Sequence, residues 1–481
     1  MVERLQELLG EFSGCRHDDI VALDQLVDEL LGSGKVLKQM REAWEVHRRP
    51  DTLHEAHGDP SRLGEFVETF LRVSSRCTLD RETRPDGTVA WKPEEYKDLI
   101  REKVRGPLST RIDGPPASTG SWWRDVYHRG AKGISDDVFG WVADPAPAAE
   151  ILKVIASAPA GKSAGHDGLD MNFWKLVTRG GAGASACLDI VTSVNNACLE
   201  IGVVPPVLKM GWITMVPKVK PDGSFACTAE NMRPITVLPE LGKVTSRLLA
   251  RRIGEVLVRR PELLAESQRG FLRDGSVGQC TDALIDVVED WRQSRQGGRA
   301  RRRRSDLYLV SYDQAKAYDS VQEYTIRASM ERFNMPESLI SLVTSGVHDA
   351  FSCVRTAGGL TRPFPVKSGV RQGDPLSPLI YALITDAMHC GLESCSMGAR
   401  ESTDPTAPWG YTFRQRDPVH DREVRVCSVG YADDTVIFAT SLAAVTGMHD
   451  WIRKFFRAHS MRLNCGKTEL LCSRCPRAAI C

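Results

Sequence analysis

The segment VGYADDTVIF, residues 429–438, places two adjacent carboxylates, Asp433 and Asp434, inside an otherwise apolar stretch. The flanking residues are mostly β-branched or aromatic, which is typical of strands. Neighbouring residues of one strand point to opposite faces of a sheet, so two aspartates within a strand could not serve one site. We therefore predict a tight hairpin with both aspartates at its tip. Because the two carboxylates repel each other and are costly to desolvate, we expect a positive charge beside them.

A third carboxylate follows another apolar stretch, in LYLVSYDQAKAYDSV (307–321). Asp313 stands at the end of a predicted strand, and Asp319 follows in a predicted turn into a helix. A strand-end carboxylate facing a pair at a hairpin tip is the arrangement that two-metal phosphoryl transfer needs, with two Mg²⁺ ions roughly 3.5–4 Å apart on shared oxygen ligands. The alternative, that these aspartates only form turns, suits Asp319 better than Asp313.

The segment SGVRQGDPLSPLIYALITDAM (368–388) combines a glycine-containing loop with a predicted helix. Ser377 and Pro378 are typical of an N-cap and a first helical position. The glycines of the loop would let the backbone approach a flat or bulky ligand closely. The flexible and polar residues of this loop are Gly369, Arg371, Gln372, Gly373 and Asp374.

Upstream, VPKVKPDGSFACTAENMRPITVL (216–238) predicts two strands joined by a loop with Lys218, Lys220 and Arg233 around it. Cations on such a hairpin suit a triphosphate or a nucleic-acid backbone. The stretch 209–304 holds nineteen Lys and Arg against eleven Asp and Glu, a net charge of +8 in a chain whose total is +1. This asymmetry indicates a local surface for a polyanion, and a solvated charged face is the alternative.

Composition places the chain among ordinary globular proteins. Its 481 residues are 42% hydrophobic and 26% charged, and they suffice for two or three domains. No run of eighteen apolar residues occurs, and the N-terminus lacks the apolar core of a signal peptide, so we expect no membrane association. The fourteen cysteines follow no framework spacing, which favours reduced thiols in an intracellular protein.

The periodicity predicts an α+β protein. Residues 1 to about 105 have helical periodicity without recognisable chemistry, and short strands alternate with helices from Ile151 onward. The predicted strands are 212–217, 234–238, 307–313 and 425–431. The predicted helices are 240–259, 279–296, 322–333, 377–395 and 442–459.

Taken in order, these blocks resemble the reverse transcriptase domain of non-LTR (LINE-type) retrotransposons. Further matching blocks are GKSAGHDGLDMNFWK (161–175), with His166 in place of the usual proline, ESQRGFLRDGS (266–276) and LNCGKTELL (463–471). The resemblance covers roughly residues 150–472. It implies a right-hand polymerase with an antiparallel palm sheet, on which Asp313 and the hairpin lie on adjacent strands flanked by helices 322–333 and 442–459. The expected divisions are a mainly helical N-terminal extension (1–149), the fingers and upstream blocks (150–305), the palm (306–472) and a short tail (473–481).

The resemblance also assigns roles. Asp313, Asp433 and Asp434 would hold two Mg²⁺ ions, for which Mn²⁺ could substitute. Tyr318 occupies the position of the sugar gate, where an aromatic ring leaves no room for a ribose 2′-hydroxyl. Further substrate contacts are expected from Lys218 and Arg233 on the triphosphate, from Arg371, Gln372 and Gly373 at the nascent base pair or template, and from Lys467 on the departing pyrophosphate.

The implied activity is that of an RNA-directed DNA polymerase, with an RNA template, a DNA primer and dNTPs as partners. The expected location is the nucleus, with a cytoplasmic ribonucleoprotein stage, and the oligomeric state stays open. We expect the thumb to be missing, which leaves as an alternative a truncated copy that binds nucleic acid without catalysis. The basic segment GGRARRRRSD (297–306), with its arginine run at 299–304, could grip nucleic acid, direct nuclear import or form a solvated loop.

Overall fold

The computed structural model describes residues 79–179, 183–218, 228–270, 275–296, 306–394, 409–416, 423–473 and 478–479. Helices and strands alternate through this part of the chain, so the predicted α+β class is confirmed. The predicted basic run at 299–304 and Lys220 lie outside the described residues. Within the described part, no helix is both long and apolar enough to cross a membrane.

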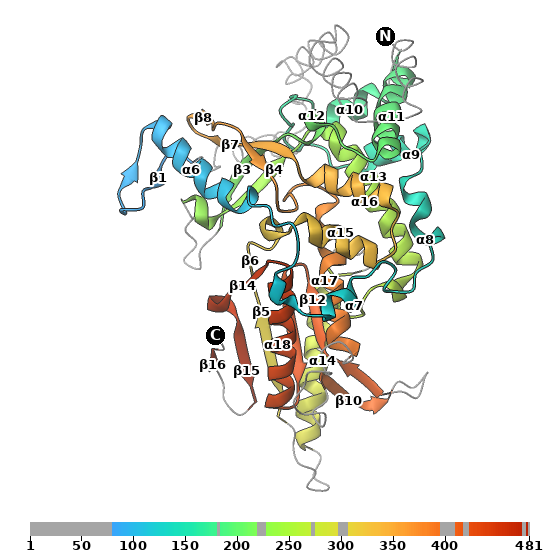
Figure 1. Cartoon of the computed structure of the whole chain (residues 1–481), viewed down its shortest axis with the longest axis vertical. Coiled ribbons are helices and arrows are strands. Elements are labelled where there is room, and N and C mark those ends of the chain that lie inside the picture. The colour runs from blue at the N-terminus through green and yellow to red at the C-terminus, as the bar shows by residue number, and fades with distance from the viewer. Residues whose placement is uncertain are drawn as a thin grey trace, which may run out of the picture.

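Five strands form an antiparallel sheet in the lower half of the molecule (Figure 1). In spatial order they are β12 (Ser428–Tyr431), β13 (Asp434–Ala439), β5 (Tyr308–Tyr312), β15 (Glu469–Cys472) and β16 (Ala478–Ala479). The predicted hairpin is present as the β12–β13 pair, and β5 lies directly beside β13. Beyond the end of β5, the short strand β6 (Gln314–Ala315) pairs with β14 (Arg462–Leu463).

The residues of the central strands alternate between two apolar layers, as the period of a strand requires. Val310 and Ile437 face the main core, which includes residues of α17 (Ser377–Ser394) and α18 (Leu442–Ala458). Leu309 and Phe438 face the other side, where α14 (Val277–Gln296) covers the sheet. The helix expected at 322–333, α15 (Glu323–Arg332), packs mainly against α16 (Glu337–Val347) and α17 instead. The expectation that α15 flanks the sheet was therefore wrong, and α14 takes that place.

A second sheet lies in the upper part of the molecule (Figure 1). Its strands are β4 (Met232–Val237), β3 (Gly211–Pro217), β7 (Ala350–Thr356) and β8 (Gly359–Leu360), with β9 (Phe364–Val366) paired to β7. The β3–β7 pair is parallel and the others are antiparallel. Helix α6 (Pro93–Leu108) buries Tyr96 and Ile100 against this sheet.

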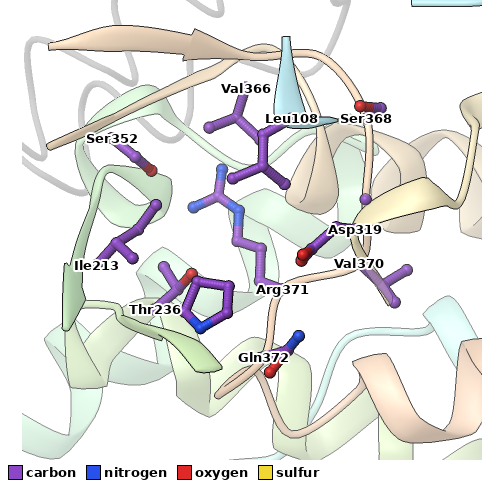
Figure 2. A pocket seen from close by; sticks show the side chains of 12 residues that line it. Leu108, Ile213, Thr236, Asp319, Ser352, Val366, Ser368, Val370, Arg371 and Gln372 are labelled. Atoms are coloured by element: carbon purple, nitrogen blue, oxygen red, sulfur yellow. The ribbon is translucent and has the colours of Figure 1, made fainter. Parts of the chain in front are cut away.

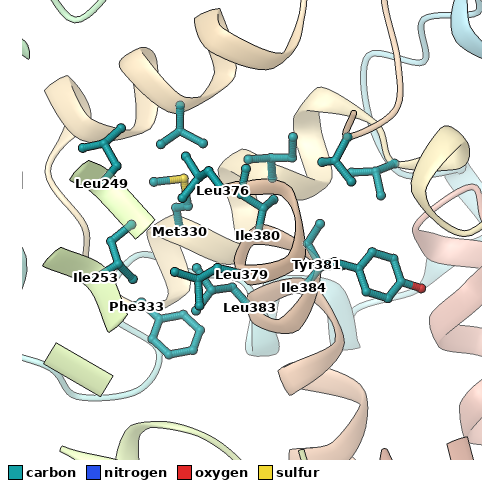
Figure 3. Close-up of a cluster of buried hydrophobic side chains, with 14 of the residues drawn as sticks. Leu249, Ile253, Met330, Phe333, Leu376, Leu379, Ile380, Tyr381, Leu383 and Ile384 are labelled. Carbon is teal, nitrogen blue, oxygen red and sulfur yellow. The ribbon is translucent and has the colours of Figure 1, made fainter. Parts of the chain in front are cut away.

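The main core joins helices from both halves of the molecule. They include α9 (Ala148–Ser157), α10 (Met171–Val177), α11 (Ala184–Ile201), α12 (Pro206–Lys209), α13 (Glu240–Arg259), α15, α16, α17 and α18. In Figure 3, Leu249 and Ile253 of α13 approach the aliphatic face of α17, together with Met330 and Phe333. The same core includes Val310 of β5 and Ile437 of β13, so the helices and the strands next to the candidate site pack on one apolar core.

The remaining elements are short. The described part of the expected N-terminal extension contains the hairpin β1 (Glu82–Thr83) and β2 (Val89–Ala90), followed by α6, α7 (Trp122–Val126) and α8 (Asp137–Gly140). The predicted strand 425–431 is divided in the structure. Strand β11 (Glu423–Val426) pairs with β10 (Tyr411–Arg416) in a separate ribbon, and only β12 joins the five-stranded sheet.

Candidate active site

The strand register brings Asp313 opposite the acidic hairpin. Tyr312 of β5 pairs with Thr435 of β13, and the two strands are antiparallel. Asp313, which follows Tyr312, therefore lies opposite Asp434, which precedes Thr435. Tyr431 pairs with Asp434 across the hairpin, which leaves Ala432 and Asp433 as its two-residue turn. Hairpins this tight need positive φ in the turn, and Ala432 has φ of +58°. This backbone is uncommon for a residue other than glycine and is typical of functional sites.

The hairpin carboxylates lie in an unfavourable electrostatic environment. Partial burial, and after it the negative charges of Asp433 and Asp313, raise the pKa of Asp434, while Lys467 acts in the opposite direction. The three predicted metal ligands therefore influence one another, and a cation between them would relieve their repulsion. Among the described residues, no three His, Cys, Asp or Glu side chains are gathered closely enough to form a metal site.

Asp313 has two partners that approach from the segment after α18. Asn464 donates from its side chain to Asp313 Oδ2 at 2.6 Å and from its backbone N–H to Asp313 O at 2.8 Å. Lys467 Nζ lies 3.3 Å from Asp313 Oδ2. Lys467 was among the predicted site residues, but Asn464 was missed. Its position three residues before Lys467, in the same sequence block, was the available signal.

Tyr318, the predicted sugar gate, begins the short 3₁₀ turn Tyr318–Ser320 that follows β6. Its ring stacks on Tyr381 of α17, with centroids 5.1 Å apart and planes at 9°. Burial, and after it the charge of Asp433, raises the pKa of the Tyr318 phenol. The sugar-gate role of Tyr318 stays a prediction.

The loop before α17 is fastened to this turn. Val370 N–H donates to Tyr318 O at 2.8 Å, and Gly369 N–H donates to Val321 O at 2.7 Å. Gly369 has φ of +85°, and a Cβ there would lie 3.1 Å from Asp319 Cα. The glycine therefore allows close approach to the protein's own backbone, where the sequence suggested approach to a ligand.

Arg371 lies in the protein interior, which corrects the expectation of a substrate contact. Only 5% of its surface is exposed, its Nε donates to Val347 O at 3.4 Å, and its Nη1 donates to Lys209 O. Burial lowers the pKa of the guanidinium to about 10. Figure 2 shows its side chain entering a small pocket near Ser352, while Gln372 lies on the other side of the loop. Arg371 therefore holds the loop in place.

Gln372 and Gly373 lie against β4. Thr236 N–H donates to Gln372 O at 2.7 Å. Gly373 has φ of +125°, and a Cβ there would lie 2.4 Å from Thr236 O, so only glycine fits without a shift. Burial raises the pKa of the Asp319 carboxyl to about 6, and the Gln372 side chain acts in the opposite direction.

The predicted N-cap at Ser377 was wrong. Helix α17 already includes Ser377, and the Ser377 hydroxyl has no hydrogen-bond partner in the described part of the chain. Asp374 takes the capping role, because its Oδ1 accepts from Leu376 N–H at 2.8 Å and its backbone oxygen accepts from Ser377 N–H at 3.3 Å.

The two predicted triphosphate cations are exposed on the β3–β4 hairpin. Lys218 directly follows β3, and Arg233 pairs with Val216 in the strand register. The positive charge of Lys218 lowers the pKa of Asp319, which opposes the larger effect of burial. The charge of Lys218 therefore acts on the turn that contains Tyr318 and Asp319. Among the described residues, no such electrostatic effect of Arg233 is found.

A segment from the expected fingers lies along the free edge of the hairpin. Gly430 N–H donates to Ser267 O and Arg269 N–H donates to Gly430 O, each at 2.9 Å. A Cβ on Gly270 would lie 2.4 Å from Ala432 N. Below the hairpin, the buried ring of His389 bonds Ser428 Oγ through Nδ1 at 3.0 Å. Backbone bonds from 267–269 along one edge and the packed His389 ring therefore hold the acidic hairpin.

Comparisons with known proteins show the family of the chain. A model of the family described as reverse transcriptase (RNA-dependent DNA polymerase) matches residues 216–477, more than half of the chain. The chain is 27% identical to a retrovirus-related Pol polyprotein from the type-1 retrotransposable element R2 of Popillia japonica, over 53% of this chain and 31% of that protein.

Two further relatives carry names of mobile elements. The transposon TX1 149 kDa protein of Xenopus laevis is 23% identical, over 96% of this chain and 33% of its own length. The RNA-directed DNA polymerase from mobile element jockey of Drosophila melanogaster is also 23% identical, over 64% of this chain and 29% of its own length. The chain thus spans about a third of the length of these curated relatives.

Solved structures of telomerase also align with the chain. The apo telomerase of Candida tropicalis gives a TM-score of 0.37 at 14% identity, covering 56% of this chain and 46% of that one. Its form truncated from the C-terminal domain gives a TM-score of 0.38 at 13% identity, covering 79% of this chain and 82% of that one.

Proposed function

We propose that this chain, which belongs to the reverse transcriptase (RNA-dependent DNA polymerase) family of non-LTR retrotransposons, is an RNA-directed DNA polymerase. It would transfer a nucleotide from a dNTP to a primer 3′-hydroxyl on an RNA template. The observation that carries this proposal is the pairing of β5 with β13, which sets Asp313 opposite Asp434 within the matched residues. The retained carboxylates disfavour the alternative of a copy that binds nucleic acid without catalysis.

We propose Asp313, Asp433 and Asp434 as ligands of two Mg²⁺ ions, with Mn²⁺ as a substitute. The donor type fits such ions, because carboxylate oxygens are the ligands that Mg²⁺ prefers. Burial, and after it the charges of Asp433 and Asp313, raise the pKa of Asp434, and bound cations would offset that repulsion. The three side chains would draw together on binding, since they are not gathered into a metal site in the described part of the chain. Bound there, the ions would stabilise charge on the transferring phosphoryl group. Asn464 and Lys467 donate to the Asp313 carboxylate and so hold its orientation.

The chain's other residues would bind and select the nucleotide. Tyr318, beside the hairpin, would exclude the ribose 2′-hydroxyl by its bulk. Gln372, fastened to β4 through its backbone oxygen, would contact the nascent base pair. Lys218 would approach the triphosphate from the end of β3, and we keep the same role for Arg233. Lys467 would move from its contact with Asp313 to the departing pyrophosphate as its charge develops.

We further propose that the five-stranded sheet is the palm of a right-hand polymerase and that the β3–β4 hairpin belongs to the fingers. The antiparallel order of the sheet and the acidic hairpin at its end support this assignment. An RNA template, a DNA primer and dNTPs are the partners that follow from it. The nuclear location, with a cytoplasmic ribonucleoprotein stage, and the boundaries at 149, 305 and 472 remain predictions.

Primer extension by the 481-residue chain tests the proposal. A DNA primer on an RNA template, with Mg²⁺ and dNTPs, should be extended by the wild type and not by Asp313→Asn or Asp433→Asn, because each variant loses a shared ligand. Asp282→Asn, at an exposed position of α14, is the matched control and should extend normally. Near-normal extension by Asp433→Asn, or none by the wild type, would contradict the proposal.

A further inference from the structure

The ring behind Tyr318 belongs to Tyr381, a fully buried residue of α17. The two rings are nearly parallel, at 9°, with centroids 5.1 Å apart. Burial, followed by the charge of Asp433, raises the pKa of both phenols. Tyr381 is thus the second ring at the site, 63 positions after Tyr318 in the chain.

Tyr381 is fixed independently of Tyr318. Its neighbours Ile380 and Ile384 anchor α17 in the main core, and Figure 3 shows the Tyr381 ring extending away from the aliphatic cluster around Leu249. Its hydroxyl donates to Oε1 of Gln314, the residue that directly follows Asp313. The Tyr381 ring is therefore tied to both the core helix and the strand that carries the first carboxylate.

Tyr318, in contrast, has no side-chain hydrogen bond in the described part of the chain. Val370 N–H donates to its carbonyl oxygen at 2.8 Å, which positions the Cα but leaves the two side-chain torsions free. The ring is only partly buried and packs against the main core, and its aromatic partner among the described residues is Tyr381. Without that contact the Tyr318 ring could move into the space that Tyr381 now fills.

We propose that Tyr381 is a specificity-determining positioning residue, which holds the Tyr318 ring where it admits deoxyribose and rejects a ribose 2′-hydroxyl. The inference rests on the proposed polymerase function. Steric exclusion requires a ring that stays in one position. If the Tyr318 ring could change its rotamer, the ribose 2′-hydroxyl would fit after a single side-chain rearrangement. The Tyr318 ring excludes the hydroxyl, and the stacked Tyr381 ring prevents the Tyr318 ring from moving away.

Extension kinetics with dNTPs and rNTPs test this role in the 481-residue chain, on an RNA template with a DNA primer. Tyr381→Leu should lower the ratio of kcat/KM for dNTP to that for rNTP by about two- to tenfold, the range that a ring–ring contact is worth. The change should appear mainly as a lower KM for the rNTP. Tyr381→Phe keeps the ring and should keep the ratio within about twofold. Tyr318→Ala should lower the ratio further.

Tyr312→Leu is the matched control. Tyr312 is equally buried, directly precedes Asp313, and stacks on another ring, that of His449, with centroids 5.8 Å apart. Its replacement should lower the melting temperature without changing the sugar ratio. If Tyr381→Leu does not fold, as judged by its melting curve, Tyr381→Met fills more of the volume without a ring and should show the same fall in ratio.

The outcomes separate the inference from the function on which it rests. A wild type that does not extend the primer overturns the proposed function, and the inference with it. An unchanged ratio in folded Tyr381→Leu or Tyr381→Met, while Tyr318→Ala relaxes selection, overturns the inference alone. An equal fall in Tyr312→Leu would also overturn it, because the effect would then be general loosening of the sheet.

Discussion

Asn464 holds Asp313 by two hydrogen bonds, one from its side chain to Oδ2 at 2.6 Å and one from its backbone N–H to the carbonyl oxygen at 2.8 Å. The two residues are 151 positions apart in the sequence, and the β6–β14 pair brings them together. The carboxylate that ends β5 is therefore oriented by a side chain from the segment that closes the sheet. Its position depends on long-range pairing as much as on its own strand.

Asn464→Ala should impair extension while the fold is retained. The side chain donates to a charged acceptor, a bond worth roughly 1.5–3 kcal/mol, so we expect about a tenfold or larger loss in kcat with little change in the KM for dNTP. Steady-state extension measures both constants. Asn231→Ala removes an exposed amide that donates to Thr228, and it should leave both unchanged. Equal activity of Asn464→Ala and the wild type would contradict a role in orienting Asp313.

Gly430→Ala should destabilise the protein and the hairpin. A Cβ at Gly430 would lie 2.5 Å from Nε2 of His389, a fully buried ring that cannot move away freely. Overpacking of this kind costs about 1–3 kcal/mol in the free energy of unfolding, and the shift would reach Asp433 through the strand. Chemical denaturation and extension should both report the loss.

Gly254→Ala is the control for that substitution. Gly254 lies inside α13, and nothing lies within 4 Å of the position of an added Cβ. We expect a gain of roughly 0.5–1 kcal/mol in the free energy of unfolding, because alanine favours a helix interior over glycine. Destabilisation by both substitutions to the same extent would contradict the specific clash with His389.

Asp319 should make stability depend on pH. Burial raises its pKa from 3.8 in the unfolded chain to about 6 in the folded state, against the opposing effects of Lys316, Gln372 and Lys218. A raised folded pKa means that the contribution of this carboxyl to stability is complete below about pH 4 and is lost as the pH rises through 6. The loss amounts to at most about 3 kcal/mol.

Asp319→Asn removes this titration. The melting temperature of the variant, relative to that of the wild type, should therefore rise between pH 4 and pH 7 and then level off. Melting curves at intervals of one pH unit measure this difference, with Asp282→Asn as the exposed control. A difference that does not change with pH would show that the Asp319 carboxyl titrates normally.

Asp434→Asn should stabilise the metal-free protein at neutral pH and abolish its response to Mg²⁺. The pKa of Asp434 is raised by burial and by the neighbouring carboxylates, so its charged form opposes folding above the unfolded pKa. Mg²⁺ should raise the melting temperature of the wild type, since a ligand that binds only the folded state stabilises it. A wild type indifferent to Mg²⁺ and Mn²⁺ would argue against the metal site without any measurement of activity.

Local pattern was sufficient for much of the fold. The aromatic and β-branched run around Asp433 predicted the hairpin, and the apolar run before Asp313 predicted β5, because both signals lie within a few residues. The predicted helix 240–259 matches α13 at both ends. The prediction of one strand at 425–431 was wrong, because the chain forms two successive strands there. The first, β11, pairs with β10, and the second, β12, pairs with β13. Strand periodicity carries no information about which sheet a strand joins.

The sequence by itself determined the family, the α+β class and the carboxylates of the site, since those depend on residue type and on order along the chain. Tertiary structure alone decided which side chains surround those carboxylates. Asn464 and Lys467 contact the Asp313 carboxylate, and the Tyr381 ring stacks on that of Tyr318. Arg371 is buried in the interior. These contacts join residues far apart in the sequence, and their geometry follows from how α17 and the sheet pack on one core. No periodicity within a single segment encodes that packing.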